Sequence, residues 1–369
     1  MNLRAIVPTL LQSATPLRAS GMPITTQTEI VAQPGESVQL SSARPPRPDR
    51  PGRLAMIRQS IDAALEAAGQ FATGPLAQCA CKVLQGKIKP APAVVPDSDL
   101  GELPAARMQR PVMFVPGFHT PIERFTPLVD KLKTDNGPVH YIRQGRFYAD
   151  CECTQPVDKV DPDCKIFVSV FSAYNLAPDG GGADELAQNL EALRQVAGTG
   201  KVDVAAFSMG GLTTREYLDR GGEAVGKLHM VGTPNHGSGL ARITMGLLEG
   251  KARGYEVDLL LGLKHVEADD EPALKWLAPN SPALARLNER WPEQRSRLES
   301  ARCFGTDLKA TVGNRFMLQP TWGDGMVAAS SLELPGMPVQ MLQDKKYALH
   351  GNLVVSPEFY LALRDHFGW

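Results

Sequence analysis

Ser208 is the strongest candidate for a nucleophile in this sequence. It follows directly on 202–207, a largely apolar run of strand length, and precedes a helix-like apolar pattern through 212–218. The residues two positions before and after the serine, Ala206 and Gly210, are small, as a sharp strand-to-helix turn requires because larger side chains would collide there. This pattern predicts a nucleophile elbow. The alternative interpretation is an ordinary turn in which the serine caps the helix.

A serine hydroxyl attacks a carbonyl carbon only when a base takes its proton, and that base needs a carboxylate that orients it. On a doubly wound sheet these groups lie on loops at the carboxyl ends of strands. His350 follows a predicted strand at 338–342, and Asp324 lies in a glycine-flanked loop after a predicted strand near 301–306. The sequence therefore predicts Asp324 as the acid and His350 as the base, in the chain order serine, acid, histidine.

Other residues compete for these roles. His236 follows the strand directly after the elbow and so comes too early in chain order for the base. Asp307 and Asp344 are the rival acids, because a glycine-flanked aspartate also occurs in plain tight turns. His119 lies beside a glycine loop. Two roles are equally possible for it: lining a pocket or lying on the surface. The remaining histidines have no motif around them and are interpreted as structural or solvated: His140, His229, His265 and His366.

Several stretches together resemble the α/β-hydrolases of the lipase and esterase group, in particular bacterial lipases with an Ala-x-Ser-x-Gly elbow. They are Val115–Phe118, Ala206–Gly211, Gly232–Ser238, Gly323–Val327 with His350, and, as a cap segment, Trp276–Asn288. The resemblance covers residues 111–369 and implies Ser208 as nucleophile, Asp324 as acid and His350 as base. Pro116 and Phe207 depart from the family, which often has His at each position, but neither position transfers protons there.

An oxyanion hole is also expected, because negative charge develops on the carbonyl oxygen as the tetrahedral intermediate forms. The Met209 N–H qualifies by position, directly after the nucleophile at the start of a helix. The Phe118 N–H, after Pro116-Gly117, is the best candidate for the second donor.

The elements around these residues alternate between strand and helix. Strands are predicted at 111–119, 165–171, 202–207 and 227–231, with helices near 121–133, 184–196 and 212–218 and a closing helix at 357–367. This alternation predicts a mostly parallel, doubly wound sheet with helices on both faces, and the resemblance implies that this sheet belongs to an α/β-hydrolase fold. Residues 138–149 are predicted as an extra strand or hairpin. Residues 240–300 break the alternation and are predicted to be a helical lid insertion, with helices at 241–250 and 282–288.

The N-terminal part differs in composition. Residues 1–53 are rich in Pro, Ser, Thr, Gln and Gly and predict a disordered or loosely packed arm. Within 54–110, apolar spacing predicts one amphipathic helix over 54–72, followed by a Pro-rich linker. The catalytic domain is predicted to span 111–369. The acidic cluster Glu267–Glu271 is interpreted as solvated lid surface rather than as a cation site.

The net charge and the lengths of the apolar runs restrict which partners and which cellular locations the protein can have. A net charge of −1 over 369 residues argues against nucleic acid or an anionic membrane as the main partner. No apolar run approaches the roughly 20 residues that span a bilayer, and Pro8 and Pro16 interrupt the only signal-like stretch. Both a cytoplasmic and a secreted location stay open.

The cysteines leave two alternatives. They are Cys79, Cys81, Cys151, Cys153, Cys164 and Cys303. The two Cys-x-Cys pairs do not have zinc spacing and have no neighbouring histidine. Either Cys164 forms a disulfide with Cys151 or Cys153, which requires an oxidising compartment, or the thiols are free.

The sequence thus predicts a serine hydrolase that cleaves carboxylic esters without cofactor or metal, acting on lipid or other hydrophobic acyl esters through a Ser-His-Asp triad. Transient contact of the lid with a lipid surface would fit this activity. Acyl transfer and thioester cleavage would use the same residues, and a non-catalytic binding protein with a vestigial triad is the alternative from another class.

Overall fold

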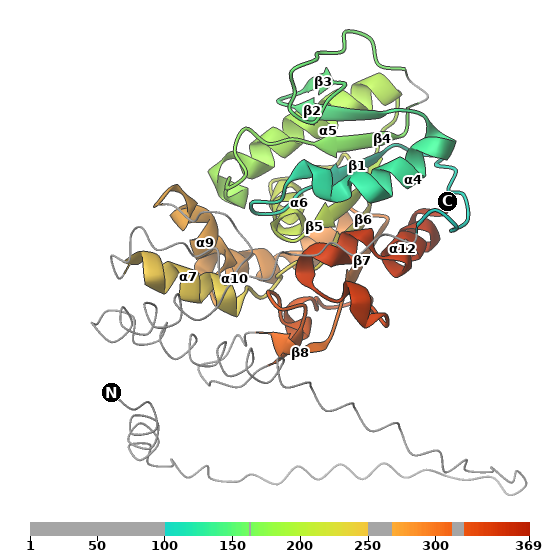
Figure 1. Cartoon of the computed structure of the whole chain (residues 1–369). Coiled ribbons are helices and arrows are strands. Elements are labelled where there is room, and N and C mark those ends of the chain that lie inside the picture. The colour runs from blue at the N-terminus through green and yellow to red at the C-terminus, as the bar shows by residue number, and fades with distance from the viewer. Residues whose placement is uncertain (1–99, 162–163, 250–267, 312–320) are drawn as a thin grey trace, which may run out of the picture. The chain divides into compact units, whose positions relative to one another are not determined.

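An eight-stranded sheet forms the centre of the computed structural model, which describes residues 100–161, 164–249, 268–311 and 321–369 (Figure 1). The strands lie in the order β10-β7-β6-β5-β1-β4-β2-β3. All neighbouring pairs are parallel except the antiparallel pair β2–β3 at one edge. The mostly parallel sheet predicted from the alternation is confirmed.

The strands of this sheet are β1 (Val112–Val115), β2 (Val139–Arg143), β3 (Arg146–Tyr148), β4 (Ile166–Ser169), β5 (Val202–Phe207), β6 (Val225–Val231), β7 (Ser300–Gly305) and β10 (Val339–Met341). A second, antiparallel sheet pairs β8 (Leu308–Thr311) with β9 (Thr321–Gly323). The α-helices are α4 (Thr126–Asn136), α5 (Ala183–Ala197), α6 (Met209–Asp219), α7 (Gly239–Glu249), α9 (Glu271–Leu277), α10 (Pro282–Glu289), α11 (Trp291–Ser296) and α12 (Pro357–Phe367). Shorter helical turns are η2 (Ile122–Phe125), η3 (Pro178–Gly182), η4 (Ala268–Asp270), η5 (Ala329–Ser331), η6 (Lys345–Tyr347) and η7 (His350–Val355).

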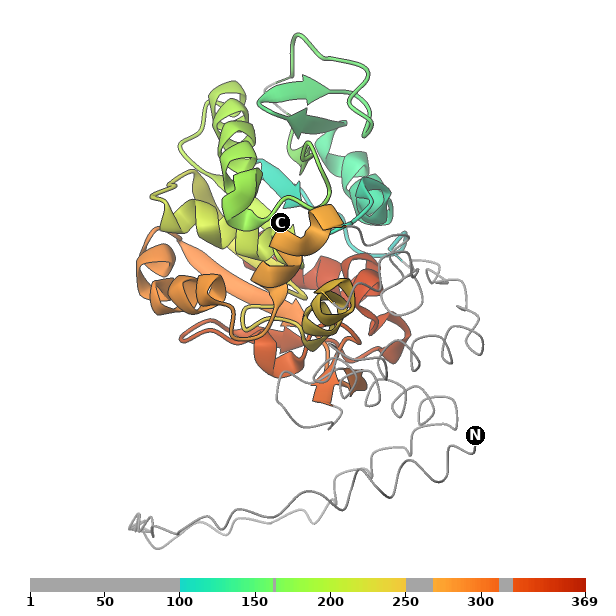
Figure 2. The same cartoon turned by 90° about the vertical axis from the view of Figure 1, so that its left-hand side faces the viewer.

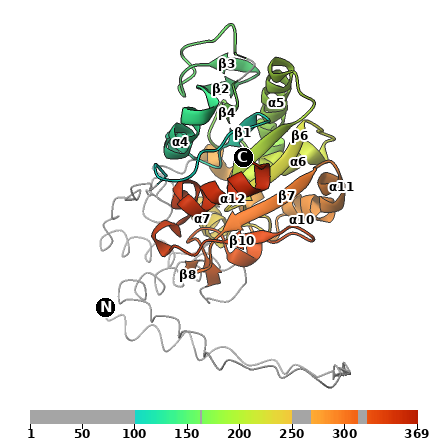
Figure 3. The same cartoon turned by 90° about the vertical axis from the view of Figure 1, so that its right-hand side faces the viewer.

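Helices cover both faces of the sheet (Figure 3). Helices α4 and α12 pack with one set of strand side chains, whereas α5, α6 and α11 pack with the other. Every residue of β1, β4 and β5 is buried. Continuous burial is typical of parallel strands that are covered on both faces, and it explains why these segments are apolar runs rather than alternating patterns. The fold class is the predicted α/β-hydrolase fold.

The segment between β6 and β7 contains α7, η4, α9, α10 and α11. Helices α7, α9 and α10 share a third hydrophobic cluster with Met209 and Leu212 of α6, and Figures 1 and 2 show them beside the sheet. Helices α7 and α10 correspond to the predicted helices at 241–250 and 282–288. Their role as a lid stays a prediction.

The structure decides between alternatives that the sequence left open and adds one hairpin that was not predicted. Residues 138–149 form the hairpin β2–β3, one of the two alternatives, whereas the hairpin β8–β9 before Asp324 was not predicted. Cys151, Cys153 and Cys164 form no disulfide with one another. Cys164 is buried in the cluster on one side of the sheet, while Cys151 and Cys153 pack against the cluster on the other side, which accounts for the absence of a disulfide among the three.

The predicted arm 1–53, the predicted helix 54–72, and Cys79 and Cys81 lie outside the described residues. In the part of the chain that the structure describes, no helix combines the length and apolar character needed to cross a bilayer.

Candidate active site

The chain turns from β5 into α6 at Ser208. The serine has φ of 53° and ψ of −126°, a conformation that is strained for a residue with a side chain. Two backbone bonds hold it: the Ser208 N–H donates to Val231 O at 2.8 Å, and the Gly211 N–H donates to Ser208 O at 3.0 Å. A Cβ on Gly210 would lie only 2.5 Å from Pro116 O, so the small residue predicted at this position is required by the neighbouring loop.

Ser208 lies next to the two residues predicted as its partners. His350 Nε2 is 2.9 Å from Ser208 Oγ, and His350 Nδ1 is 2.6 Å from Asp324 Oδ2. The side chains of His350 and Asp324 are buried. These residues come from the turn after β5, the loop after β9 and the start of η7, and together they form one hydrogen-bonded chain from hydroxyl to carboxylate.

The Asp324 carboxylate is fixed on both oxygens. Oδ1 accepts the backbone N–H groups of Met326 at 2.9 Å and Val327 at 2.7 Å, which leaves Oδ2 for the imidazole. Because an ionised carboxylate only accepts hydrogen bonds, His350 must donate from Nδ1. Its Nε2 is then the acceptor that faces the Ser208 hydroxyl, which is the arrangement a general base needs.

Two residues shape the space around the imidazole. Gly232 follows β6 with φ of 58°, and a Cβ there would lie 3.0 Å from His350 Cε1 and 3.3 Å from Asp324 Oδ2. The Phe207 ring packs against the His350 ring with centroids 4.8 Å apart. The Phe207 side chain, which departs from the resembled family, therefore serves here as a packing surface for the histidine.

Both predicted oxyanion donors lie at this turn. A Cβ on Gly117 would lie 2.7 Å from Ser208 Cβ and 2.9 Å from Phe207 O, so the loop that carries Phe118 passes directly against the nucleophile. The Met209 N–H belongs to the first residue of α6, where no intrahelical acceptor exists. Among the described residues, neither the Phe118 N–H nor the Met209 N–H has an acceptor. This is the state that the predicted oxyanion hole requires, and their role as its donors stays a prediction.

The rival residues are placed elsewhere. His236 Nε2 contacts Glu333 O at 2.9 Å, and Asp344 caps η6 through the Lys346 N–H. Asp307 is exposed on the segment between β7 and β8. His366 Nδ1 lies 3.2 Å from His229 Nδ1, away from the triad. Burial raises the pKa of the Cys303 thiol to about 12, so this buried cysteine is not a competing nucleophile.

The acidic cluster contributes a contact that the sequence did not reveal. Asp270, interpreted as solvated lid surface, is buried, and its Oδ1 lies 2.7 Å from His119 Nε2. His119 is thus not free on the surface; its contact with Asp270 joins the loop after β1 to the turn directly before α9. A local acidic run gives no sign of which carboxylate turns inward, because the partner is 151 residues away in the chain.

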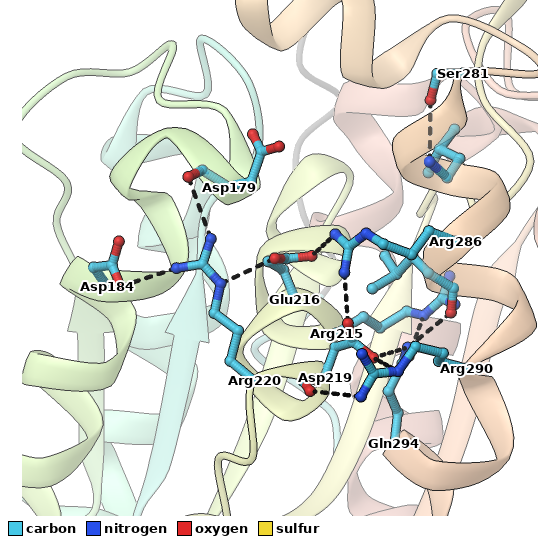
Figure 4. A network of polar contacts seen from close by, with 12 residues as sticks. Asp179, Asp184, Arg215, Glu216, Asp219, Arg220, Ser281, Arg286, Arg290 and Gln294 are labelled. Atoms are coloured by element: carbon cyan, nitrogen blue, oxygen red, sulfur yellow. Dashed lines mark hydrogen bonds and ion pairs between the residues drawn. The ribbon is translucent and has the colours of Figure 1, made fainter.

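A polar network anchors the elbow helix to the inserted helices (Figure 4). Arg215 is completely buried and donates to Gln294 Oε1, Asn235 Oδ1 and Leu287 O. Burial lowers the pKa of Arg215 to about 9, with the Asp219 carboxylate acting in the opposite direction. Close by, Arg286 bridges Glu216 and Asp219, each at 2.6 Å. The network fixes α6, and therefore Ser208, against α10 and α11.

One group of side chains has the composition of a cation site. Ligand atoms of Glu123, Cys151 and Glu152 lie within 4.8 Å of one another. Burial, followed by the Glu152 carboxylate, raises the pKa of the Cys151 thiol to about 11, which disfavours the thiolate that binds metals. We assign no ligand to this group.

The sheet topology, the strained serine between β5 and α6, and the Asp–His pair on later loops are arranged as in an α/β-hydrolase fold. No protein-family model matches the chain, and no curated protein sequence does. Solved structures are similar to it at low identity. The mature lipase BlEst2 of Bacillus licheniformis is 16% identical, with 73% of this chain and 96% of that chain covered and a TM-score of 0.47.

A gene product of Listeria innocua is 18% identical, with 70% and 93% covered and a TM-score of 0.46. Phospholipase PlaB of Legionella pneumophila is 14% identical, with 70% and 63% covered and a TM-score of 0.41. The fold assignment rests on the topology of this chain.

Proposed function

We propose that this protein is a serine hydrolase that cleaves carboxylic esters through an acyl-enzyme. The observation that carries the proposal is the continuous chain Ser208 Oγ, His350 and Asp324, with contacts of 2.9 Å and 2.6 Å. A buried chain of this kind activates a hydroxyl that is otherwise a poor nucleophile.

In the first half-reaction, Ser208 Oγ attacks the ester carbonyl carbon while His350 Nε2 takes the hydroxyl proton. Asp324 holds the imidazole and stabilises the positive charge that develops on it. The carbonyl oxygen becomes an oxyanion and accepts from the Phe118 and Met209 N–H groups. One such donor is typically worth about 3–4 kcal/mol of transition-state stabilisation. Collapse of the intermediate breaks the ester C–O bond, and His350 gives its proton to the leaving alcohol.

In the second half-reaction, water attacks the acyl-enzyme. His350 takes a proton from this water and returns one to Ser208 Oγ as the acid leaves. An alcohol in place of water would give acyl transfer, and a thioester would enter by the same first step.

The surroundings of the triad favour an ester with an apolar acyl group. Leu349, directly before His350, and Tyr174, whose carbonyl accepts the His119 N–H at 2.9 Å, are exposed by 46% and 51%. These are two of the three large hydrophobic side chains that are exposed among the described residues. Apolar side chains that stay in water beside a polar site suit a hydrophobic ligand or a lipid surface.

The test is a series of p-nitrophenyl esters of increasing acyl length. We expect turnover of these esters by the wild type, with kcat/KM rising from acetyl toward longer chains, and loss of turnover on the order of 10⁴-fold or more in Ser208→Ala. Ser296→Ala is the matched control, because Ser296 is an exposed serine of α11 that bonds only its own helix at Glu293 O. Folded wild-type protein that turns over no ester of the series contradicts the proposal. Product analysis in the presence of an added alcohol separates hydrolysis from acyl transfer.

A further inference from the structure

His119, the residue after the predicted oxyanion donor Phe118, is held on both its backbone and its side chain. Its φ is 46°, a left-handed value that is uncommon outside glycine. Its N–H donates to Tyr174 O at 2.9 Å, and its Nε2 lies 2.7 Å from Asp270 Oδ1. The position of the Phe118 N–H therefore depends on a neighbour whose strained backbone needs these outside contacts.

Asp270 is a buried anchor rather than a surface charge. Its side chain is 2% exposed, and Asn175 Nδ2 donates to the same Oδ1 atom at 2.9 Å. A carboxylate that is withdrawn from water requires such donors, since an unpaired buried charge is costly. Because a carboxylate only accepts, His119 donates from Nε2. The loops that carry His119 and Asn175 thus both contact Asp270, the residue that ends η4 and directly precedes α9.

Apolar packing links the same parts. The Phe118 ring lies edge-on to the His119 ring, with centroids 4.5 Å apart. Phe118 also packs against the third hydrophobic cluster, which contains Met209 of α6 and residues of α9 such as Leu274. Of the two residues that carry the predicted oxyanion donors, Met209 therefore belongs to a cluster built largely from the inserted helices, and Phe118 packs against it.

We propose that Asp270 is a positioning residue that acts through His119 to hold the Phe118 N–H at the oxyanion site, so that seating of α9 completes the hole. This inference rests on the proposed ester hydrolysis and adds the residue pair on which its transition-state stabilisation depends. Displacing an oxyanion donor weakens an interaction that forms fully only in the transition state.

Kinetics of Asp270→Ala and His119→Asn test the proposal. Asn tolerates a left-handed φ, so His119→Asn preserves the backbone conformation while its shorter side chain loses the hydrogen bond to Asp270. We expect kcat to fall by about 10- to 100-fold in each variant with KM changed by less than about twofold. The double variant should lose no more than the stronger single variant, since both remove the same contact.

A second measurement reads the oxyanion site directly. A trifluoromethyl ketone forms a hemiketal with Ser208 whose oxyanion occupies the hole, so its inhibition constant should rise in Asp270→Ala in proportion to the fall in kcat/KM. Asp270→Asn keeps an acceptor oxygen at the same place and should show a smaller loss, and it replaces Asp270→Ala if that variant does not fold. Glu271→Gln is the matched control, because Glu271 pairs with Lys275 at the exposed surface of α9 and should behave as wild type.

The outcomes distinguish this inference from the proposed function. Wild-type protein that turns over no ester and binds no trifluoromethyl ketone contradicts the proposed function. The positioning role alone is overturned if the wild type is active and the folded His119→Asn and Asp270 variants keep the wild-type kcat. The same holds if only the KM of these variants rises.

Discussion

Gly232 lies so close to His350 that an added Cβ would sit 3.0 Å from the imidazole Cε1 and 3.1 Å from Nδ1. The glycine adopts φ of 58° at the end of β6, and its N–H donates to Phe304 O at 2.9 Å on the neighbouring β7. The backbone at Gly232 cannot easily shift away from His350, because this hydrogen bond joins it to β7. The space for the imidazole is therefore built into the strand end.

Gly232→Ala should impair activity more than stability. The left-handed φ costs an alanine about 1 kcal/mol. The new methyl group displaces the His350 imidazole from hydrogen-bonding distance to Ser208 Oγ. We expect kcat to fall by about 100-fold, since small displacements in a site of this kind have large effects. Steady-state kinetics and thermal unfolding of the same preparation check this. Gly336→Ala, at a surface turn with φ of 71° and open space around a Cβ, is the control for backbone strain alone.

Asp324→Asn should reduce kcat on the order of 10⁴-fold through the tautomer of His350. The backbone N–H groups of Met326 and Val327 both require an acceptor at the Oδ1 position. The amide oxygen of the asparagine must stay there, so its NH₂ group faces His350 Nδ1. The imidazole then carries its proton on Nε2 and cannot take one from Ser208. Kinetics together with a histidine NMR spectrum check this, and a variant that keeps more than about a tenth of wild-type kcat speaks against the assignment.

Arg215→Met should destabilise the fold. It leaves Asn235 Oδ1 and Gln294 Oε1 without their buried donor, whereas Leu287 O keeps the Gln294 Nε2 donor at 2.7 Å. It also removes the guanidinium that lies 5.3 Å from the Trp291 ring centroid. We expect a loss of about 3 kcal/mol in the free energy of unfolding in urea.

Arg194→Met is the control for Arg215→Met. Arg194 pairs with Glu191 on the solvated face of α5, and its loss should cost less than about 1 kcal/mol. Equal midpoints of urea unfolding for the two variants would contradict a structural role for the buried network.

Acid should destabilise the protein through the buried pair His229 and His366. Burial, followed by the positive charges of Arg302 and Lys227, lowers the pKa of His366 to about 3, against the weaker effect of Asp365. Burial also lowers the pKa of His229 well below its usual value. The unfolded chain therefore binds protons as pH falls below about 6.5, where the folded chain does not. Stability is retained above pH 6.5 and lost as pH falls from there toward 3.

For His366 alone this loss is about 2 kcal/mol between pH 7.5 and pH 5. Urea unfolding at several pH values measures it. Ser300 Oγ lies 2.7 Å from His366 Nε2, and the side-chain amide of His366→Gln keeps a polar partner for it. In this variant the slope of unfolding free energy against pH should be smaller by that contribution. A variant whose slope equals that of the wild type would show that His366 is not the group responsible.

The sequence was most informative where local rules apply. The elbow strand, the small residues around Ser208 and the alternation of strands and helices follow from periodicity and steric crowding within a few residues. The same rules placed Asp324 and His350 on loops at one edge of the sheet, where the structure brings them to Ser208.

These local rules did not predict contacts between residues that are far apart in the chain. The inward turn of Asp270 within an acidic run depends on His119 and Asn175, which lie in loops far away in the chain. Arg215 occupies an ordinary helix position, and only the packing of α10 and α11 makes it a buried anchor. Likewise, the spacing of Cys164 from Cys151 allowed a disulfide, but the side of the sheet on which each thiol lies depends on the tertiary fold.

Covalent labelling of Ser208 tests the central claim most directly. Wild-type protein treated with a fluorophosphonate should gain one phosphonyl group, located by peptide mapping on the tryptic fragment that contains Ser208. Ser208→Ala should not react, and His350→Ala should react far more slowly because the hydroxyl has lost its base. Folded wild-type protein that stays unlabelled, or that is labelled at another residue, would contradict the account.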